Sequence, residues 1–227
     1  MAFKTGQHLH ELVQAAMVRQ YDMDCEVPVD LRSLGYPISG HADGVYILDG
    51  LTIVAEIKTK KAYPMKLARR KRIPELHEVQ QAGMYAMGIG ADAIHLIYYA
   101  KDNAGTARKP QDFVEAGETV EWLLYLDQEV PGDGRTVEQV ASAEATRITA
   151  IAGQVEDGMI PERFIPGYGT VPVLPDPGSM DAPWRCRYCD YWGLCETLPA
   201  GQVAASEVLI PIRKDADVGS VETIETV

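Results

Sequence analysis

The sequence YPISGHADGVYILDGLTIVAEIK, residues 36–58, predicts a β-hairpin. Asp49 and Gly50 separate two runs that are rich in strand-forming residues, and Asp-Gly is a preferred pair for a two-residue hairpin turn. The second run is almost entirely apolar until Glu56 and Lys58 appear at its end. A run of this kind indicates a strand that is buried on both faces and carries charged side chains at one edge of the sheet.

The sequence on either side of the hairpin predicts helices and further strands. Apolar residues recur at helical spacing over two segments, and Thr5 is the expected N-cap of the first. A third helix is indicated by Pro74 at its start and by Gly88 and Gly90 at its end. The expected helices cover residues 5–21, 75–88 and 137–155, and the expected further strands cover 26–29, 94–100, 119–126 and 208–210. Together these elements predict an α/β fold with a central mixed sheet flanked by helices.

Length and composition fit one substantial domain. The chain has 227 residues, of which 46% are hydrophobic, and this is enough to bury one core with a small accessory lobe. No run approaches the roughly 18 apolar residues of a membrane span, so we expect a cytoplasmic protein with no membrane partner. Residues 1–200 are expected to form a single domain, with a Pro-rich linker at 161–183 and a C-terminal tail at 201–227.

Charge is distributed unevenly along the chain. The formal net charge of −12 would by itself argue against a nucleic-acid partner, because such partners are bound through Lys and Arg. Eight of the 21 Lys and Arg residues, however, lie between Lys58 and Arg72 with no acidic residue among them. A solvated loop or helix face and a nucleic-acid contact are both compatible with this basic strip. The candidates for DNA contact within it are Lys60, Lys61, Lys66, Arg69, Arg70, Lys71 and Arg72.

The four cysteines predict a metal centre. Three of them form a C-x2-C-x5-C run at Cys186, Cys189 and Cys195, which leaves a four-thiolate centre one ligand short, and Cys25 can complete it. Tryptophan and tyrosine residues surround the run, as the water-poor shell of an iron–sulfur cluster requires. The pattern favours a 4Fe-4S cluster in a lobe formed by Cys25 and residues 183–197. A four-cysteine Zn²⁺ site is the main alternative, and two disulfides are a weaker one.

Charged side chains of the hairpin indicate chemistry at a second metal ion. Glu56 and Lys58 are two apart on one strand and therefore point to the same face, while Asp43 lies on the paired strand. Carboxylates on two paired strands can share a hard divalent cation such as Mg²⁺. A lysine beside that ion can orient or deprotonate a water and stabilise the charge that develops on phosphorus. For a Glu-x-Lys taken alone, a surface ion pair is the alternative interpretation.

Four motifs in order along the chain resemble those of the RecB-like branch of the PD-(D/E)XK nucleases. They are Gly6-Gln7-His8-Leu9-His10, Gly40-His41-Ala42-Asp43, Glu56-Ile57-Lys58 and Gln81-Ala82-Gly83-Met84-Tyr85. With its cysteines the chain looks like the iron–sulfur members, notably the fourth CRISPR-associated (Cas) protein family, its phage-encoded relatives and the AddB-type helicase-nucleases. The resemblance covers about residues 5–100 and 183–197. In those relatives the solitary cysteine usually precedes the motif histidine, whereas here Cys25 follows His10.

The resemblance implies a metal site and a catalytic lysine. Asp43 and Glu56 would be metal ligands within the catalytic set, and Lys58 would be the catalytic lysine. His10 would be a further ligand, and the backbone carbonyl of Ile57 another. The implied metal is Mg²⁺ or Mn²⁺, and an imidazole ligand favours Mn²⁺.

The same resemblance assigns supporting residues near the lysine. Gln81 and Tyr85 lie four apart on one helix face and would help to hold the lysine, the water or the DNA. Gln80 would replace Gln81 if the helix began differently. His8 lies two residues from His10 and would face elsewhere on its helix.

The implied protein has a restriction-endonuclease-like PD-(D/E)XK core and an iron–sulfur-stapled C-terminal lobe. Its implied activity is that of a Mg/Mn-dependent deoxyribonuclease, an exonuclease that hydrolyses the phosphodiester bonds of DNA, preferably single-stranded. The implied setting is phage or bacterial recombination or repair, or CRISPR adaptation, with proteins of those pathways as partners, in the host cytoplasm if phage-encoded. The alternatives are a non-catalytic DNA-binding adaptor of nuclease fold and a zinc-stapled endonuclease.

Overall fold

The computed structural model describes residues 2–103, 112–160, 164–165, 169–170 and 203–204, and side chains within 6–103 and 112–159. By its internal contacts the chain divides into two compact units, residues 1–150 and 151–227. The first unit holds the main sheet, three helices and most of a fourth. The expectation of a single domain over residues 1–200 stays a prediction.

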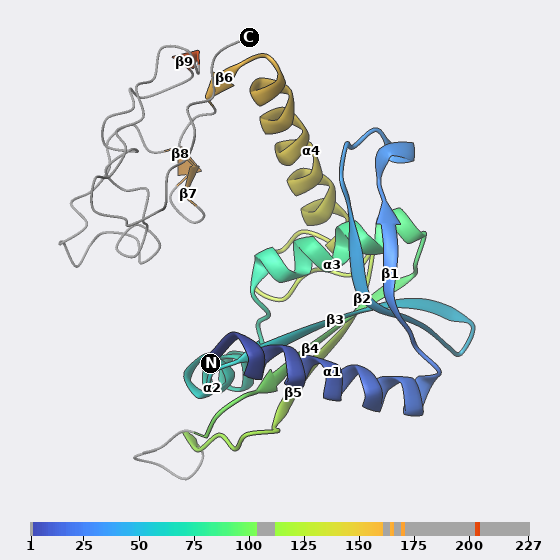
Figure 1. Ribbon diagram of the computed structural model, residues 1–227, viewed down its shortest axis with the longest axis vertical. Helices are drawn as coiled ribbons and strands as arrows, with labels where there is room; N and C mark the ends of the chain where they lie inside the picture. Colours follow the sequence, from blue (N-terminus) through green and yellow to red (C-terminus); the bar gives the residue numbers. More distant parts are fainter. Residues whose placement is uncertain (1, 104–111, 161–163, 166–168, 171–202, 205–227) are drawn as a thin grey trace, which may run out of the picture. The chain divides into compact units, whose positions relative to one another are not determined.

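The first unit is built on a five-stranded mixed sheet in the order β1-β2-β3-β4-β5 (Figure 1). The strands are β1 (Asp24–Asp30), β2 (Ser39–Leu48), β3 (Leu51–Lys60), β4 (Ala93–Ala100) and β5 (Thr119–Tyr125). Only β3 and β4 are parallel, and the other neighbouring pairs are antiparallel. The prediction of an α/β fold with a central mixed sheet is confirmed.

The predicted hairpin is present at the centre of this sheet. Leu48 pairs with Leu51, so Asp49 and Gly50 form a two-residue turn, and their φ angles of 52° and 83° are both positive. Positive φ at both central positions is what the right-handed twist of the flanking strands favours. β3 is the middle strand, and its residues from Ile53 to Ile57 are all buried, as its apolar sequence predicts.

Helix α1 (Ala2–Tyr21) covers one face of the sheet. Its apolar residues Val13 and Met17 belong to the same buried cluster as Ile53 and Ile57 of β3. The face on which apolar residues recur every three to four positions is therefore the face that packs on the sheet. The helix begins at Ala2, so the prediction of Thr5 as its N-cap is wrong. Helix ends are harder to predict from sequence than helix centres, because polar residues are common both in the last turn of a helix and in the segment beyond it.

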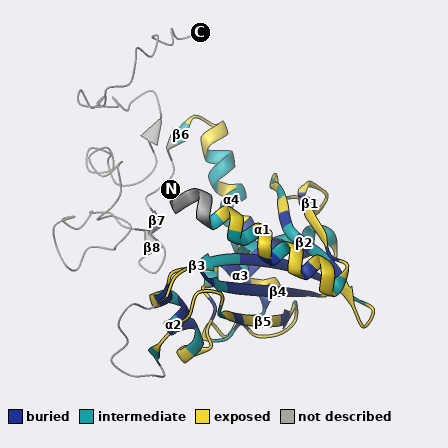
Figure 2. Ribbon diagram, turned by 60° about the horizontal axis from the view of Figure 1, so that its bottom comes forward, coloured by how far each residue is buried: buried dark blue, intermediate teal, exposed yellow. Residues whose placement is uncertain are grey.

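The remaining helices build the core on the opposite face. They are α2 (Ala62–Lys71), α3 (Leu76–Ile89) and α4 (Val137–Glu156), and their buried residues share one cluster with β4. Figure 2 shows buried residues, in dark blue, concentrated along the central strands β3 and β4. The connection from β3 to β4 runs through α2 and α3, as two parallel neighbours require.

Short two-stranded pairings follow the main sheet in the chain. β6 (Met159–Ile160) pairs with β9 (Val203–Ala204), and β7 (Phe164–Ile165) pairs with β8 (Gly169–Thr170). The cysteine run, the expected linker apart from these pairings, and the expected strand at 208–210 lie outside the described residues. Within the described part, no helix is long and apolar enough to cross a bilayer.

Candidate active site

The hairpin brings Asp43 of β2 beside the charged end of β3. Gly44 pairs with Ala55, which places Asp43 opposite Glu56 in the antiparallel register. The Asp43 carboxylate does not point into solvent, because its Oδ2 accepts a hydrogen bond of 2.7 Å from the backbone N–H of Ile57. This bond fixes one carboxylate oxygen and leaves the other, Oδ1, turned toward α1.

His10 of α1 lies next to that second oxygen. Its Nε2 is 3.6 Å from Asp43 Oδ1, and the two side chains keep only 24% and 19% of their exposure. His8 is turned away and its Nδ1 lies 3.3 Å from Glu11 on the helix surface. Of the two histidines of the first motif, His10 is therefore the one beside the carboxylate.

A third potential ligand, Glu26 of β1, was not predicted from the sequence. One ligand atom each from His10, Glu26 and Asp43 lie within 4.8 Å of one another. Glu26 has a φ of 52°, an uncommon conformation for a residue with a side chain, and it lies opposite Asp43 in the β1–β2 register. Gln14 Nε2 donates to Glu26 Oε1 and to the backbone carbonyl of Asp43, both at 2.9 Å, and so ties the two strands together.

On the other face of β3, four polar side chains form a continuous chain of contacts. Lys58 Nζ lies 2.5 Å from Glu56 Oε1 and donates to Gln81 Oε1 at 3.1 Å. Gln81 Nε2 donates in turn to the Tyr85 hydroxyl at 3.2 Å. Gln81, rather than Gln80, therefore contacts the lysine.

The ring of Tyr85 packs against the strand that carries Asp43. A Cβ placed on Gly40 would lie 2.9 Å from the Tyr85 hydroxyl oxygen and 3.0 Å from a ring carbon. Any larger residue at Gly40 would therefore displace the end of the contact chain. Close packing against Tyr85 therefore explains why the second motif has a glycine at this position, which motif spacing alone does not indicate.

The site concentrates negative charge in a buried place. Glu56 is 1% exposed, and burial together with the nearby Asp43 charge raises its pKa to about 7. Burial also raises the pKa of Asp43, although the bond from the Ile57 N–H opposes the shift. Glu56 Oε2 has no hydrogen-bond partner although it is buried. Such an orphaned carboxylate oxygen needs a partner that the protein atoms do not supply.

Lys58 remains a cation in this setting. Burial lowers the pKa of its ammonium group, but the Glu56 carboxylate beside it more than compensates and leaves the pKa above its ordinary value. The ammonium therefore serves as a fixed positive charge in contact with a buried carboxylate.

The donor set fits a divalent cation. Carboxylate oxygens of Glu26 and Asp43 with an imidazole nitrogen of His10 are ligands that Mg²⁺ and Mn²⁺ accept. The orphaned oxygen of Glu56 would be a further donor. The backbone carbonyl expected to contribute, that of Ile57, belongs to the residue whose N–H already holds Asp43. A cation here would offset the repulsion between the buried carboxylates.

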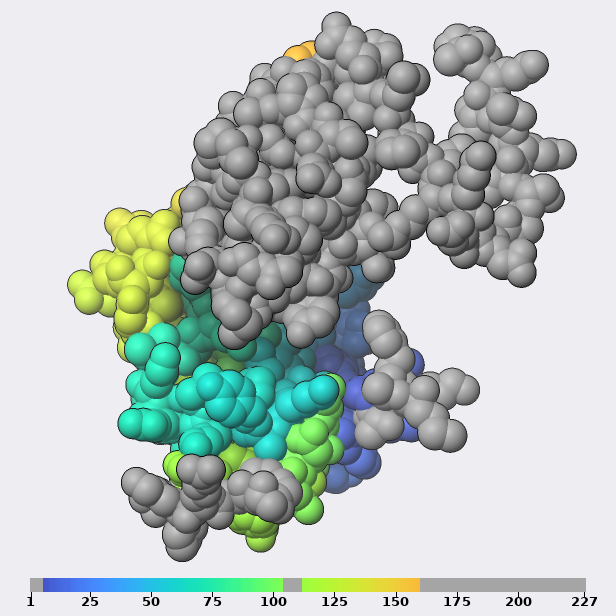
Figure 3. Space-filling model, turned by 90° about the vertical axis from the view of Figure 1, so that its left-hand side faces the viewer, coloured from blue at the N-terminus to red at the C-terminus, as the bar shows by residue number. Residues whose placement is uncertain are grey.

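The structure divides the predicted basic strip in two. Four of its eight side chains form ion pairs within the protein: Lys58 with Glu56, Lys60 with Glu75 and Glu78, Lys66 with Asp112, and Arg69 with Glu118. The other four, Lys61, Arg70, Lys71 and Arg72, are exposed and form no ion pair among the described side chains. Figure 3 shows the residues of α2, in cyan, at the surface of the molecule beside the green residues around the end of β4.

Of the four cysteines, only Cys25 falls within the described residues. It is an exposed residue of β1, paired with Gly44 of β2, and partial burial with the charges of Glu26 and Asp24 raises the pKa of its thiol. Cys186, Cys189 and Cys195 lie outside the described part of the chain. The cluster and its lobe therefore stay predictions.

Fold and site together define a protein with a mixed-sheet α/β core and a candidate cation site beside its central β2–β3 hairpin. The chain belongs to the PD-(D/E)XK nuclease superfamily, whose family model matches residues 3–196. Members of this superfamily are generally metal-dependent nucleases, so the resemblance read from the motifs is confirmed at the level of the superfamily. Among solved structures, the crystal structure of SSO0001 is similar with 18% identity and a TM-score of 0.43, covering 83% of this chain and 68% of that one. No curated protein matches the chain.

Proposed function

We propose that this protein is a Mg/Mn-dependent deoxyribonuclease that degrades single-stranded DNA from its ends. The setting we infer is phage or bacterial DNA recombination or repair, or CRISPR adaptation. The observation that carries the proposal is the cluster of His10, Glu26 and Asp43 next to a buried carboxylate. That carboxylate, Glu56, lies close enough for the Asp43 charge to raise its pKa, and it contacts the Lys58 ammonium. A bare ion pair at a strand end would have neither an imidazole nor an orphaned carboxylate oxygen next to it.

Each side chain then has a part in phosphodiester hydrolysis. His10, Glu26 and Asp43, with Glu56 as a further donor, would hold the cation, which would supply Lewis-acid activation of water and neutralise charge on the phosphate. Lys58 holds its ammonium within reach of an attacking water and of the developing negative charge on the phosphate oxygens. Because its geometry is fixed before substrate arrives, little reorganisation is needed in the transition state.

Gln81 and Tyr85 position the lysine and do not take part in the chemistry. Gln81 accepts a hydrogen bond from Lys58 and is itself held by the Tyr85 hydroxyl, which limits the rotamers of a long, flexible side chain. The exposed cations Lys61, Arg70 and Lys71 follow the catalytic strand in the sequence. We attribute the preference for single strands to them, because a flexible phosphate backbone can bend to contact each of these charges.

The proposal is tested by digestion of labelled DNA with purified protein. Linear single strands labelled at either end, circular single strands and linear duplexes of the same sequence are incubated with Mg²⁺, Mn²⁺ or EDTA. We expect mononucleotide or short products from linear single strands with either metal, none with EDTA, and intact circles.

The control is the Lys58→Met protein, prepared and assayed in parallel. Cleaved circles would contradict end-dependent action while leaving the nuclease in place. Absence of metal-dependent cleavage of every DNA by the folded wild-type protein would contradict the nuclease itself and favour the adaptor.

A further inference from the structure

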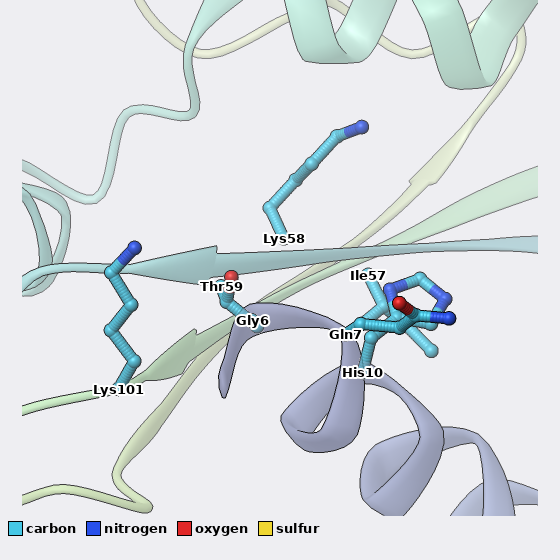
Figure 4. A pocket seen from close by; sticks show the side chains of 7 residues that line it. All are labelled: Gly6, Gln7, His10, Ile57, Lys58, Thr59 and Lys101. Carbon is cyan, nitrogen blue, oxygen red and sulfur yellow. The ribbon is translucent and has the colours of Figure 1, made fainter. Parts of the chain in front are cut away.

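A hollow of about 530 Å³ opens beside the candidate metal site, between α1 and the end of β3. Figure 4 shows Gly6, Gln7 and His10 of α1 facing the β3 residues that end at Thr59, with Lys101 at the far side. Its volume lies within the roughly 300–1,000 Å³ of small-ligand pockets, so one nucleotide unit fits. Since His10 belongs both to the hollow and to the metal site, a chain bound in the hollow continues directly into that site.

Lys101 brings an unneutralised charge to this hollow. Its side chain is partly buried, and it forms no ion pair with any carboxylate among the described side chains. The neighbouring carboxylate, Asp102, is engaged elsewhere, since its Oδ1 accepts a 2.6 Å hydrogen bond from the N–H of Ala62. Among the residues that the structure describes, no acidic side chain lines the hollow. A partly buried ammonium without a counterion attracts an anion more strongly than one on a fully solvated face.

The backbone holds Lys101 in place at the edge of the sheet. Its N–H donates to the carbonyl of Lys60 at 2.8 Å, which extends the parallel β3–β4 pairing by one residue beyond Ala100. In Figure 4 its side chain extends toward the end of the strand that carries Thr59. Gln7 and Thr59 add neutral hydrogen-bonding groups to the same hollow. Fixed backbone, a free ammonium and neutral donors together suit a phosphate with its sugar.

We propose that this hollow seats the nucleotide next to the scissile phosphate of a single DNA strand, with Lys101 as the residue that positions its phosphate. The inference rests on the proposed nuclease function and adds a binding subsite to it. Lys101 lies outside the basic strip, so its role is separate from any contact that α2 makes with DNA. Lys101 acts by binding in the ground state and the transition state alike, and its loss should raise KM more than it lowers kcat.

The test measures binding and cleavage in Lys101→Ala and Lys101→Arg, with Arg19→Ala as the matched control. Arg19 is an exposed residue in the last turn of α1, the helix whose first half lines the hollow. Its removal changes the net charge by the same amount without altering the residues of the hollow. Anisotropy of a short fluorescent oligothymidylate, in EDTA and over a KCl series, gives the slope of log Kd against log salt. Lys101→Ala should make that slope shallower by about 0.7, the value of one single-strand phosphate contact. KM for cleavage should rise roughly threefold to tenfold with kcat nearly unchanged.

Lys101→Arg and Arg19→Ala should both retain the wild-type slope. A Lys101→Ala protein with wild-type slope and KM would overturn the inference even if cleavage is robust. A wild-type protein that never cleaves DNA but loses the slope on Lys101→Ala would instead contradict the proposed function and leave the phosphate subsite standing. Thermal unfolding of each variant shows whether a shallower salt slope reflects loss of the fold. Because Lys101→Arg keeps the positive charge, a wild-type slope in this variant attributes the change in Lys101→Ala to the lost charge.

Discussion

At the scale of single residues, the site depends on backbone conformations and on atoms without partners. Glu26 reaches the site with a φ of 52°, which costs a non-glycine residue about 1 kcal/mol or more. Glu56 keeps a buried oxygen without a partner. Both features are unfavourable in the metal-free protein, and both are explained if the carboxylates meet a cation.

The first prediction concerns Glu26 as a ligand. Glu26→Gln removes one negative charge and keeps the size and the hydrogen bond from Gln14, so the fold should be preserved. We expect Mn²⁺ to bind roughly tenfold or more weakly, as measured by calorimetry or by the EPR signal of free Mn²⁺. Glu11→Gln, on the exposed surface of α1, is the matched control. Equal affinities in the two variants would exclude Glu26 from the metal site.

The second prediction concerns the titration of Glu56. Its pKa in the folded protein, about 7, is above the value of an unfolded glutamate, so its contribution to stability is present below about pH 4.5 and is lost as pH rises through about 7. In EDTA, the wild-type free energy of unfolding should therefore fall between pH 5 and pH 8 relative to Glu56→Gln, by no more than about 3 kcal/mol. Urea unfolding of both proteins at the two pH values measures this difference. Parallel profiles would show that Glu56 is not buried as described.

At the scale of elements, α3 is fastened to β3 by a charged cluster. Lys60 Nζ lies 2.6 Å from Glu78 Oε1 and 3.1 Å from Glu75 Oε1, and it sits 4.4 Å from the centre of the Tyr98 ring. Its side chain is only 12% exposed and that of Glu78 7%. The cluster holds α3 in the position along β3 at which Gln81 accepts a hydrogen bond from Lys58.

The third prediction follows from this cluster. Lys60→Met would leave the Glu78 carboxylate buried without its cation, and we expect a loss of about 2–4 kcal/mol in the free energy of unfolding. The double variant Lys60→Met/Glu78→Gln should recover most of that loss, because no buried charge is left alone. Urea unfolding of the three proteins tests the coupling. A Lys60→Met protein of wild-type stability with weakened DNA binding would instead make Lys60 a DNA contact.

The elements that sequence could predict are those with a local signal. The Asp49-Gly50 turn and the apolar run of β3 are local patterns, and both are found where expected. Helix α2 was not predicted, because its many charges hide the three buried residues that pack it, Ala62, Met65 and Ala68. Glu26 could not be predicted either, since its place depends on how β1 registers with β2 and on one unusual φ angle. The ion pairs of the basic strip were also out of reach, because Asp112 and Glu118 are distant in sequence.

At the scale of the whole molecule, the predicted iron–sulfur cluster would join Cys25, in the first sheet strand, to a run some 160 residues later. Such a link would act as a structural clamp, since it closes a very long loop of chain. A cluster with this role would be separate from the candidate cation site of His10, Glu26 and Asp43, and the two should be lost independently.

The fourth prediction separates the two metal centres. Cys189→Ser should remove the absorbance at roughly 400 nm of the anaerobically purified protein and lower its melting temperature, because the cluster loses a thiolate. Asp43→Ala should keep that absorbance and lose cleavage. A colourless wild-type protein that contains one zinc per chain by elemental analysis would replace the cluster with the zinc site. A colourless protein without zinc would contradict a four-cysteine centre altogether.

The central claim is that Lys58, beside the cation site, drives the hydrolysis of DNA. The most direct measurement is the single-turnover cleavage rate of a labelled single strand in Mn²⁺ by wild type and Lys58→Met, with unfolding and oligonucleotide binding measured on the same preparations. We predict a loss of about a hundredfold or more in rate, with DNA binding nearly unchanged and the protein still folded. A folded Lys58→Met protein that cleaves at the wild-type rate would contradict the account.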